Sequence, residues 1–376
     1  NMHLYGRDWD REYLRRAVGN MDQIAGVRCV QLDDGNERPA RAALLHTGTG
    51  LELSVLLDRC MDISATSFQG QALGWRSVTG DVAPQYFEAE GIRWLRSYFG
   101  GLVTTCGLTN VGAPAADSAL SGNGLHGRIG HTPARQVSVR EEWVGDNYEI
   151  SVSGTMREAV VFGENLSLKR TVGTRLGANS FWITDELTNE GFRRTPYMLL
   201  YHCNLGWPLL DAGARILSPS RHVAPRDEAA RKGQGVWAVM DPPTHGYQEQ
   251  VFFHDMVPDD EGNVTVALIN KGLAEGNGLG LYLKYSHATL PRFVQWKQMG
   301  EQDYVLGFEP STCGVQGRHV DEEKGLLHCL EPGESRTMRL EFGVILTAAE
   351  AEALEQQYAG IQTKIVDNYQ EFTQQP

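Results

Sequence analysis

Alternation of apolar and polar residues runs through most of this 376-residue chain, and it constrains the fold more than any other feature. A period of two puts every second side chain on one face, which is typical of half-buried β-strands. Gly145-Asp146-Asn147 and residues 177–180 read as hairpin turns between such segments. The pattern predicts an all-β fold, a large antiparallel β-sandwich. Later strands are expected at residues 264–269, 279–285, 293–297, 304–308 and 336–346.

Helical patterns are confined mostly to the two ends of the chain. Residues 8–18 carry apolar side chains on one side only. Residues 347–361 begin with Thr347 and Glu350 at capping-box spacing, and apolar residues follow at helical intervals. We find no repeat, low-complexity tract or linker that divides the sequence. It therefore predicts a single β-sandwich domain over residues 1–376, with short helices at its ends.

Charge and cysteine content bear on partners and compartment. The 34 Lys and Arg against 47 Asp and Glu give a net charge of −13. This argues against a nucleic acid or an anionic membrane, since either requires a basic face, and suits a neutral, hydroxyl-rich ligand. The six cysteines form no CxxC pair, which favours reduced thiols over zinc and predicts a cytoplasmic protein. Neither a bilayer-spanning apolar run nor a secretory signal is evident.

Arg59 lies in an apolar stretch, residues 56–63. A guanidinium there needs an anionic or multi-hydroxyl partner, because an unpaired buried charge is costly. Two interpretations stay open. Arg59 binds a ligand, or it forms an ion pair with a carboxylate such as Asp58 or Asp62.

His126 and Arg128 lie in a glycine-bracketed segment, residues 124–133. Glycines let the backbone approach a ligand closely, and the two side chains project the same way if the segment is extended. His126 and His131 are conceivable metal ligands, but no third ligand occurs at a recognised spacing, so we predict no metal site. A structural histidine bonded to backbone carbonyls is the remaining alternative.

His202 and Glu309 are the candidates for proton transfer. His202 follows an apolar strand, Asn204 comes two residues later, and imidazole is the side chain that ordinarily titrates near neutral pH. The alternative is a core histidine with satisfied hydrogen bonds. Glu309 ends another apolar strand, where a partly desolvated carboxylate gains the basicity of a general base. Its alternative is an ion pair with Lys297 or Arg59.

Together these segments resemble the aldose 1-epimerase (galactose mutarotase-like) superfamily, and within it the DUF4432-type branch, over about residues 40–346. Residues 125–127, Leu-His-Gly, are similar to the element whose histidine binds sugar hydroxyls. Residues 201–205, Tyr-His-Cys-Asn-Leu, resemble the segment that carries the general acid. Residues 306–310 resemble the strand of the general base, and residues 330–334 match a late Pro-Gly-Glu turn. The order His, His, Glu is also the superfamily's order.

The resemblance implies an isomerase of carbohydrate metabolism that interconverts sugar anomers without a cofactor. Glu309 would be the base and His202 the acid, and either Trp296 or Trp207 would stack on a sugar face. The chain departs from the superfamily at residues 99–107, which lack its arginine, and this puts hexose specificity in doubt. The superfamily's sugar-gripping aspartate is also missing from its usual context. The expected substrate-binding residues are His126, Arg59, Arg128, Asn204, Lys297, Trp296, Glu249 and His254.

Several other functions stay open at this level. One is an epimerase or isomerase that acts on another sugar carbon, with or without a metal. Another is a phosphosugar 1-epimerase that uses Arg59, Arg128 and Lys297. A third is a non-catalytic sugar-binding protein on the same fold. An exposed sandwich edge could also pair two copies into a homodimer.

Overall fold

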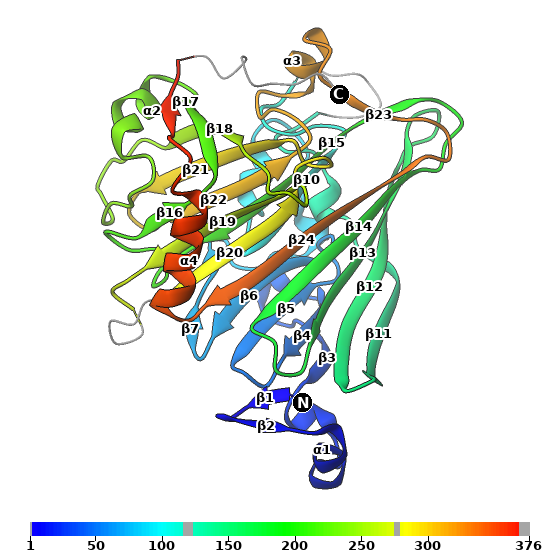
Figure 1. The fold of residues 1–376 in the computed structure, drawn as a ribbon. Coiled ribbons are helices and arrows are strands. Elements are labelled where there is room, and N and C mark those ends of the chain that lie inside the picture. Colours follow the sequence, from blue (N-terminus) through cyan, green and yellow to red (C-terminus); the bar gives the residue numbers. More distant parts are fainter. Residues whose placement is uncertain (1, 116–122, 274–278, 368–376) are drawn as a thin grey trace.

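Two large β-sheets pack face to face in the computed structural model, which describes residues 2–115, 123–273 and 279–367 (Figure 1). Neighbouring strands are antiparallel except β17 and β25, so the expected antiparallel sandwich is confirmed. Eleven strands of the 13-stranded sheet follow one another in the order β25 (Lys364–Ile365), β17 (Ser220–Pro225), β18 (Gln250–Met256), β21 (Arg292–Met299), β22 (Tyr304–Ser311), β15 (Thr195–Leu205), β10 (Val103–Leu108), β6 (Asp62–Phe68), β5 (Leu51–Leu56), β4 (Arg41–His46) and β3 (Gly26–Gln31). The other two are β23 (His328–Leu330), which pairs with β15, and β7 (Gln71–Ala72), which pairs with β6. The 8-stranded sheet has the order β11 (Arg135–Val144), β12 (Asn147–Ala159), β13 (Asn165–Arg175), β14 (Ser180–Asn189), β24 (Ser335–Ile345), β20 (Leu279–Ser286), β19 (Asn263–Asn270) and β16 (Arg215–Leu217).

The two hairpins expected from turn chemistry are present. β11 and β12 meet across the turn at Gly145 and Asp146, where Val144 pairs with Asn147. β13 and β14 are likewise antiparallel neighbours joined at residues 176–179. All five later strands expected from alternation also form, as β19, β20, β21, β22 and β24.

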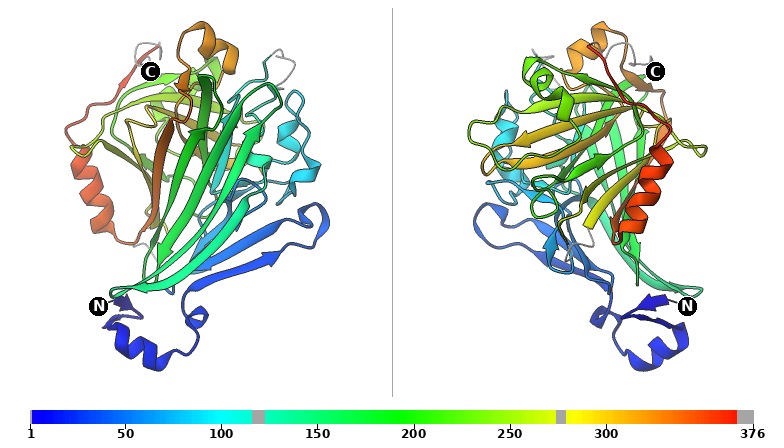
Figure 2. Two further views of the ribbon diagram at one scale, coloured as in Figure 1. Left: turned by 90° about the vertical axis from the view of Figure 1, so that its right-hand side faces the viewer. Right: turned by 60° about the vertical axis from the view of Figure 1, so that its left-hand side comes forward.

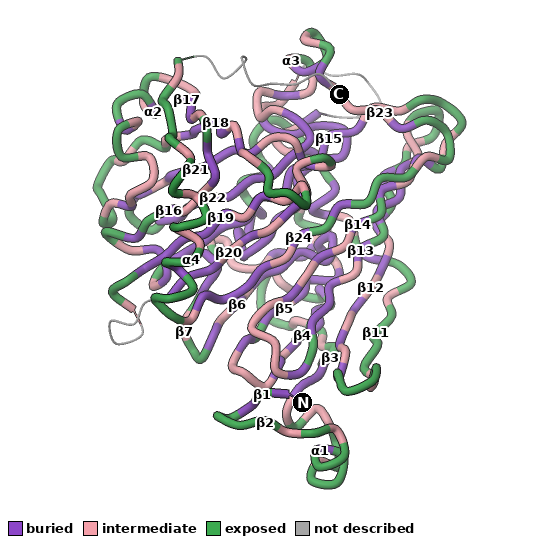
Figure 3. Tube along the Cα trace, viewed as in Figure 1, coloured by how far each residue is buried: buried purple, intermediate pink, exposed green. Residues whose placement is uncertain are grey.

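The main core lies between the sheets, where alternate strand residues of both layers are buried (Figure 3). Val152, Ile183 and Leu340 come from the 8-stranded sheet, and Val103 and Phe308 come from the other. All six cysteines are free thiols, and four of them are buried.

A fully buried ionic network links the two sheets. Arg170 of β13 donates to Asp62 of β6 at 2.9 Å and to Asp185 of β14 at 2.7 Å, and Tyr201 Oη donates to Asp185 at 2.6 Å. Removing one member of such a network leaves a buried charge uncompensated, which is strongly destabilising. Since Tyr201 precedes His202, the network fixes the face that β15 turns to the core.

Helices lie mainly at the periphery, and two of them are near the ends of the chain. α1 (Arg11–Ala17) is shorter than the expected 8–18, because β2 (Arg7–Trp9) pairs with β1 (Met2–Leu4) and Asp10 caps the helix. α4 (Ala348–Tyr358) has the expected capping box at Thr347 and ends before 361. Figure 2 shows α1 and the β1–β2 hairpin protruding from one end of the sandwich. The other α-helices are α2 (Glu228–Gly233) and α3 (Arg318–Glu323); within the described ranges, none is long and apolar enough to cross a bilayer.

Candidate active site

β15 and β22 place the two proton-transfer candidates side by side on the outer face of the 13-stranded sheet. Tyr201 and Cys203 of β15 face the main core, so His202 faces outward. Glu309 of β22 faces the same way, and the distance from His202 Nε2 to Glu309 Oε1 is 2.6 Å. Both side chains are about 95% buried. The acid and base suggested by the sequence are therefore in direct contact.

Asn204 and Tyr98 hold the opposite edge of the His202 ring. His202 Nδ1 lies 2.6 Å from Asn204 Oδ1 and 3.1 Å from Tyr98 Oη, and Tyr98 donates to the same Oδ1 at 2.9 Å. The amide orientation follows from its other end, since Asn204 Nδ2 donates to the carbonyl oxygens of His202 and Gly100. An amide oxygen only accepts, so Nδ1 of His202 carries a proton.

Because Nδ1 of His202 keeps its proton, the proton that His202 can exchange is the one at Nε2. With Nδ1 protonated, the short contact between His202 Nε2 and Glu309 Oε1 is occupied by a proton that belongs to one atom or the other. When the proton is on Nε2, His202 is an acid and Glu309 is a base. The pair can then give one proton and take another within a single site.

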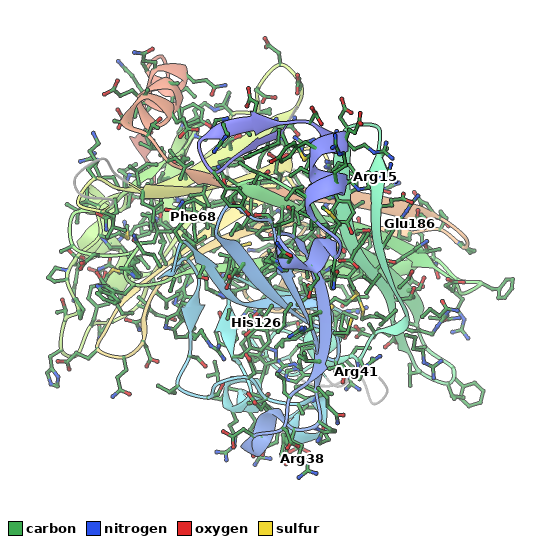
Figure 4. All side chains as sticks on the ribbon, turned by 90° about the horizontal axis from the view of Figure 1, so that it is seen from below. Arg15, Arg38, Arg41, Phe68, His126 and Glu186 are labelled. Atoms are coloured by element: carbon green, nitrogen blue, oxygen red, sulfur yellow. The ribbon has the colours of Figure 1, made fainter. Side chains whose placement is uncertain are left out.

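His126 reaches the same place from the segment between β10 and β11. Its ring centroid is 5.8 Å from that of His202, and its backbone has a φ of 57° next to Gly127. The backbone N–H of Gly112 donates to His126 Nδ1 at 3.1 Å, so the proton of the neutral ring lies on Nε2. Burial, and then the charge of His202, lower the pKa of His126 to about 3, which keeps it a neutral donor. In the view from below, His126 lies well within the outline of the molecule (Figure 4).

Trp296, Glu249 and Arg226 form the far rim. Trp296 of β21 donates its indole N–H to Glu249 Oε2 at 2.7 Å. Arg226 donates to the other carboxylate oxygen, Oε1, at 3.2 Å. A carboxylate can accept about four hydrogen bonds, so Glu249 can accept another from a ligand hydroxyl besides those from Trp296 and Arg226. The charge of Arg226 balances that of Glu249.

All of these side chains except Asn204 line one cavity of about 350 Å³. A larger hollow of about 840 Å³ lies over β4, β5 and β6 and is lined by Trp75 and Trp207. We assign the chemistry to the smaller cavity, because His202, Glu309 and His126 all line it. Trp296, and not Trp207, therefore offers an aromatic face beside the acid–base pair.

Arg59 does not reach this cavity, which corrects the expectation that it binds the ligand. Its side chain is fully buried and donates to the carbonyl oxygens of Gly130, Val82 and Ser97 at 2.6, 2.8 and 3.0 Å. Burial lowers the pKa of Arg59 to about 10. Backbone carbonyls of distant loops accept three hydrogen bonds from Nε and Nη1, while the buried Nη2 has no hydrogen-bond partner among the described residues. Neither interpretation from the sequence included this arrangement.

Arg128, Lys297 and His254 also lie away from the described cavity lining. Arg128 is exposed. Lys297 follows Trp296 on β21 and so points to the other face, where it donates to the carbonyl oxygens of Val236 and Val239. His254 is held by Ser220 and Gln295 on that same side of the sheet. Asn204 is near the site, but it contacts His202 from behind.

Sequence reasoning missed Tyr98, Trp94 and Arg226. Tyr98 and Trp94 come from the segment around the 3-10 helix η4 (Arg93–Arg96), and their rings stack at 4.4 Å. Such a segment has no periodicity that would mark its inward side chains. Arg226 directly follows β17, and a charged residue at a strand end was the one available signal.

A metal site needs at least three donor side chains close together. Within residues 2–115, 123–273 and 279–367, no three His, Cys, Asp or Glu side chains are grouped to hold an ion. The donors at the cavity are instead arranged in hydrogen-bonded pairs.

Comparison with known proteins identifies the family of the chain. A family model described as a domain of unknown function, DUF4432, matches residues 37–344. The chain belongs to the DUF4432 family. The matched range contains every residue that lines the cavity. A search of curated proteins finds no match.

Solved structures share the fold of this DUF4432 protein. A "putative aldose 1-epimerase" from Klebsiella pneumoniae is 26% identical, covers 93% of each chain and has a TM-score of 0.86. A galactose mutarotase-like protein from Clostridium acetobutylicum is 12% identical over 86% of this chain and 100% of its own, with a TM-score of 0.58. Galactose 1-epimerase from Lactobacillus acidophilus is 13% identical over 85% and 99%, with a TM-score of 0.53. The suspected superfamily is thus confirmed at the level of fold.

Proposed function

We propose that this DUF4432 protein is an aldose 1-epimerase, which interconverts the anomers of a sugar by acid–base ring opening. The observation that carries the proposal is the buried contact between His202 Nε2 and Glu309 Oε1, at 2.6 Å, on the wall of a cavity of about 350 Å³. Mutarotation requires an acid and a base that act on two oxygens bonded to one carbon, so the two groups must be close together.

The steps follow from the atoms present. Glu309 takes the proton of the anomeric hydroxyl while His202 Nε2 gives its proton to the ring oxygen, and the bond from C1 to the ring oxygen breaks. The open aldehyde rotates about its C1–C2 bond. His202 then removes the proton from the former ring oxygen as it attacks the other face of C1, and Glu309 returns a proton to the new anomeric hydroxyl. Each group ends as it began.

Two neighbours support this chemistry. The neutral His126 carries its proton on Nε2 and can donate to the ring oxygen as charge develops there. The Trp296 ring offers a flat apolar surface for the CH-rich face of a pyranose, and Glu249 lies beside it for a hydroxyl. Arg59, Arg128 and Lys297 are not among the described lining residues, and Arg226, which does line the cavity, is paired with Asp227 and Glu249. This charge balance favours a neutral sugar over a phosphorylated one.

A screen by saturation-transfer NMR tests the proposal. Anomerically pure aldoses and ketoses are mixed with the wild-type protein, and the rate of anomer exchange is measured above the buffer rate. We expect at least one sugar to exchange faster with the protein, and His202→Asn to lower that rate by about 10²-fold or more. Exchange at the buffer rate for every sugar would overturn the proposal, and deuterium incorporation at a ring carbon would instead indicate an epimerase acting elsewhere.

A further inference from the structure

The floor of the cavity changes character next to the acid–base pair. Strand pairing sets His202, Glu309 and Val294 in one row across β15, β22 and β21, since Val294 pairs with Glu309 and His202 contacts it from the other side. In the next row, Trp296 of β21 pairs with Val251 of β18. The proton-transfer groups are therefore followed directly by aliphatic side chains.

These aliphatic side chains form a continuous surface. Val251 and Val294 pack together with Phe253, and Val315 and Trp296 pack against them. Leu125 lines the cavity beside His126, and Ile92 and Leu95, with 62% and 50% of their surface exposed, line it from the segment before Tyr98. We call Leu125, Val251, Val294 and Val315 the aliphatic wall.

The polar groups of the cavity are already committed elsewhere. Glu309 and His202 act on the anomeric centre, and the His126 ring centroid lies 5.8 Å from that of His202. Glu249 lies at the far rim, where it accepts from Arg226 and from the indole N–H of Trp296 and serves another hydroxyl of the sugar. A sugar hydroxyl placed over the aliphatic wall would give up its bonds to water without gaining a partner there.

We propose that the substrate is a 6-deoxyhexose, whose methyl group packs on the aliphatic wall while its anomeric centre contacts Glu309 and His202. This inference rests on the proposed function. C6 is the one position of a hexopyranose at which loss of a hydroxyl leaves a methyl group, which gains free energy when it is buried against valine and leucine. A hydroxymethyl group in its place would bring a hydroxyl that the wall cannot satisfy.

Matched sugar pairs test the preference. The rate of anomer exchange is measured for D-fucose against D-galactose and for L-rhamnose against L-mannose, which differ only at C6. Because an apolar pocket rejects a hydroxyl-bearing analogue by up to about 10²-fold, we expect kcat/KM of one 6-deoxy sugar to exceed that of its partner by about 10- to 100-fold. Equal or higher values for both fully hydroxylated sugars, or a stronger preference for 2-deoxyglucose over glucose, would overturn the proposal.

Variants locate the preference in the wall. Val294→Thr keeps the shape of the side chain and adds a hydroxyl, so we expect the ratio to fall to within about threefold. Val266→Thr on β19 is the matched control, because Val266 is fully buried in the other sheet, and it should leave the ratio unchanged. Val251→Thr repeats the test if Val294→Thr does not fold. An unchanged ratio in the folded wall variant contradicts the proposal.

Binding separates this inference from the proposed function. Saturation-transfer difference NMR on Glu309→Gln measures sugar affinity without turnover. Preferential binding of the 6-deoxy sugar, with no exchange by the wild-type protein, would overturn the epimerase activity and support the substrate class. Exchange of a fully hydroxylated sugar, without any 6-deoxy preference, would support the epimerase activity and overturn the substrate class.

Discussion

Replacing Asn204 by leucine separates the positioning of His202 from its chemistry. Asn204 is fully buried, and its Oδ1 accepts from His202 Nδ1 at 2.6 Å and from Tyr98 Oη at 2.9 Å. Leucine keeps the volume and removes the acceptor. Tyr98 Oη and His202 Nδ1 still lie 3.1 Å apart, so Tyr98 can donate to Nδ1 once Nδ1 is unprotonated. The carbonyl oxygens of His202 and Gly100 lose the amide donor of Asn204. A buried polar group left unpaired costs about 1–3 kcal/mol, which sets the expected fall in the free energy of unfolding.

The effect on rate is larger than the effect on binding. Without Oδ1, the neutral His202 ring can carry its proton on Nε2 and accept from Tyr98 at Nδ1. That tautomer cannot take a proton from the sugar in the closing step, so we expect kcat to fall by about 10- to 100-fold, since positioned acid–base groups contribute at least this much. KM should change by less than about threefold, because Asn204 does not line the cavity.

Asn189→Leu is the matched control. Asn189 is also fully buried, and its amide donates to the carbonyl oxygens of Arg193 and Leu330 away from the site. We expect a similar loss of stability by urea unfolding and an unchanged kcat. In parallel, ¹⁵N NMR of His202 should show Nδ1 protonated in the wild type and unprotonated in Asn204→Leu. Wild-type kcat in a folded Asn204→Leu, or an equal fall in the control, would refute the role of Asn204.

Two further predictions concern residues that the structure places outside the cavity. Arg59→Met should lower the free energy of unfolding by about 2–4 kcal/mol, because buried carbonyls lose their donors, while KM stays the same; a raised KM at wild-type stability would restore a ligand role. Burial lowers the pKa of His254 to about 4, so the folded protein keeps it neutral while the unfolded chain takes up a proton below about pH 6.5. Its contribution to stability is therefore complete above pH 6.5 and is lost as the pH falls toward 4, by about 1.4 kcal/mol per pH unit. Urea titrations of His254→Gln should show a shallower acid loss than those of the wild type, and equal slopes would contradict this reasoning.

Alternation carried most of what could be predicted about the fold. It identified the strands because half-buried strands impose a period of two, and short turn sequences set hairpin register. Where both faces of a strand are buried, alternation could not tell which set of alternate residues faces the site. Trp296 and Lys297 are neighbours on β21, so only one of them can point into the cavity, and that choice depends on pairing with β18 and β22.

The site was predictable where a polar residue interrupts an apolar strand and not where it depends on distant loops. His202 and Glu309 are polar residues in apolar stretches, and their contact follows from the pairing of β15 with β22. The expectation that each stands at the end of its strand was wrong, because β15 continues to Leu205 and β22 continues through Pro310 to Ser311. Arg59 donates to carbonyls of residues 82, 97 and 130, and Tyr98 comes from the segment around a 3-10 helix. Neither contact has a local signature, because the partners are brought together only by the tertiary fold.

The most direct test of the acid–base account compares two buried carboxylates. Glu309 and Glu158 are equally buried, but Glu158 accepts from Leu108 N–H and Thr109 Oγ1 and does not line the cavity. We predict that Glu309→Gln lowers anomer exchange, measured by saturation-transfer NMR on the best sugar, by about 10²-fold or more, while Glu158→Gln retains the wild-type rate. Exchange by Glu309→Gln at the wild-type rate would contradict the assignment of Glu309 as the base.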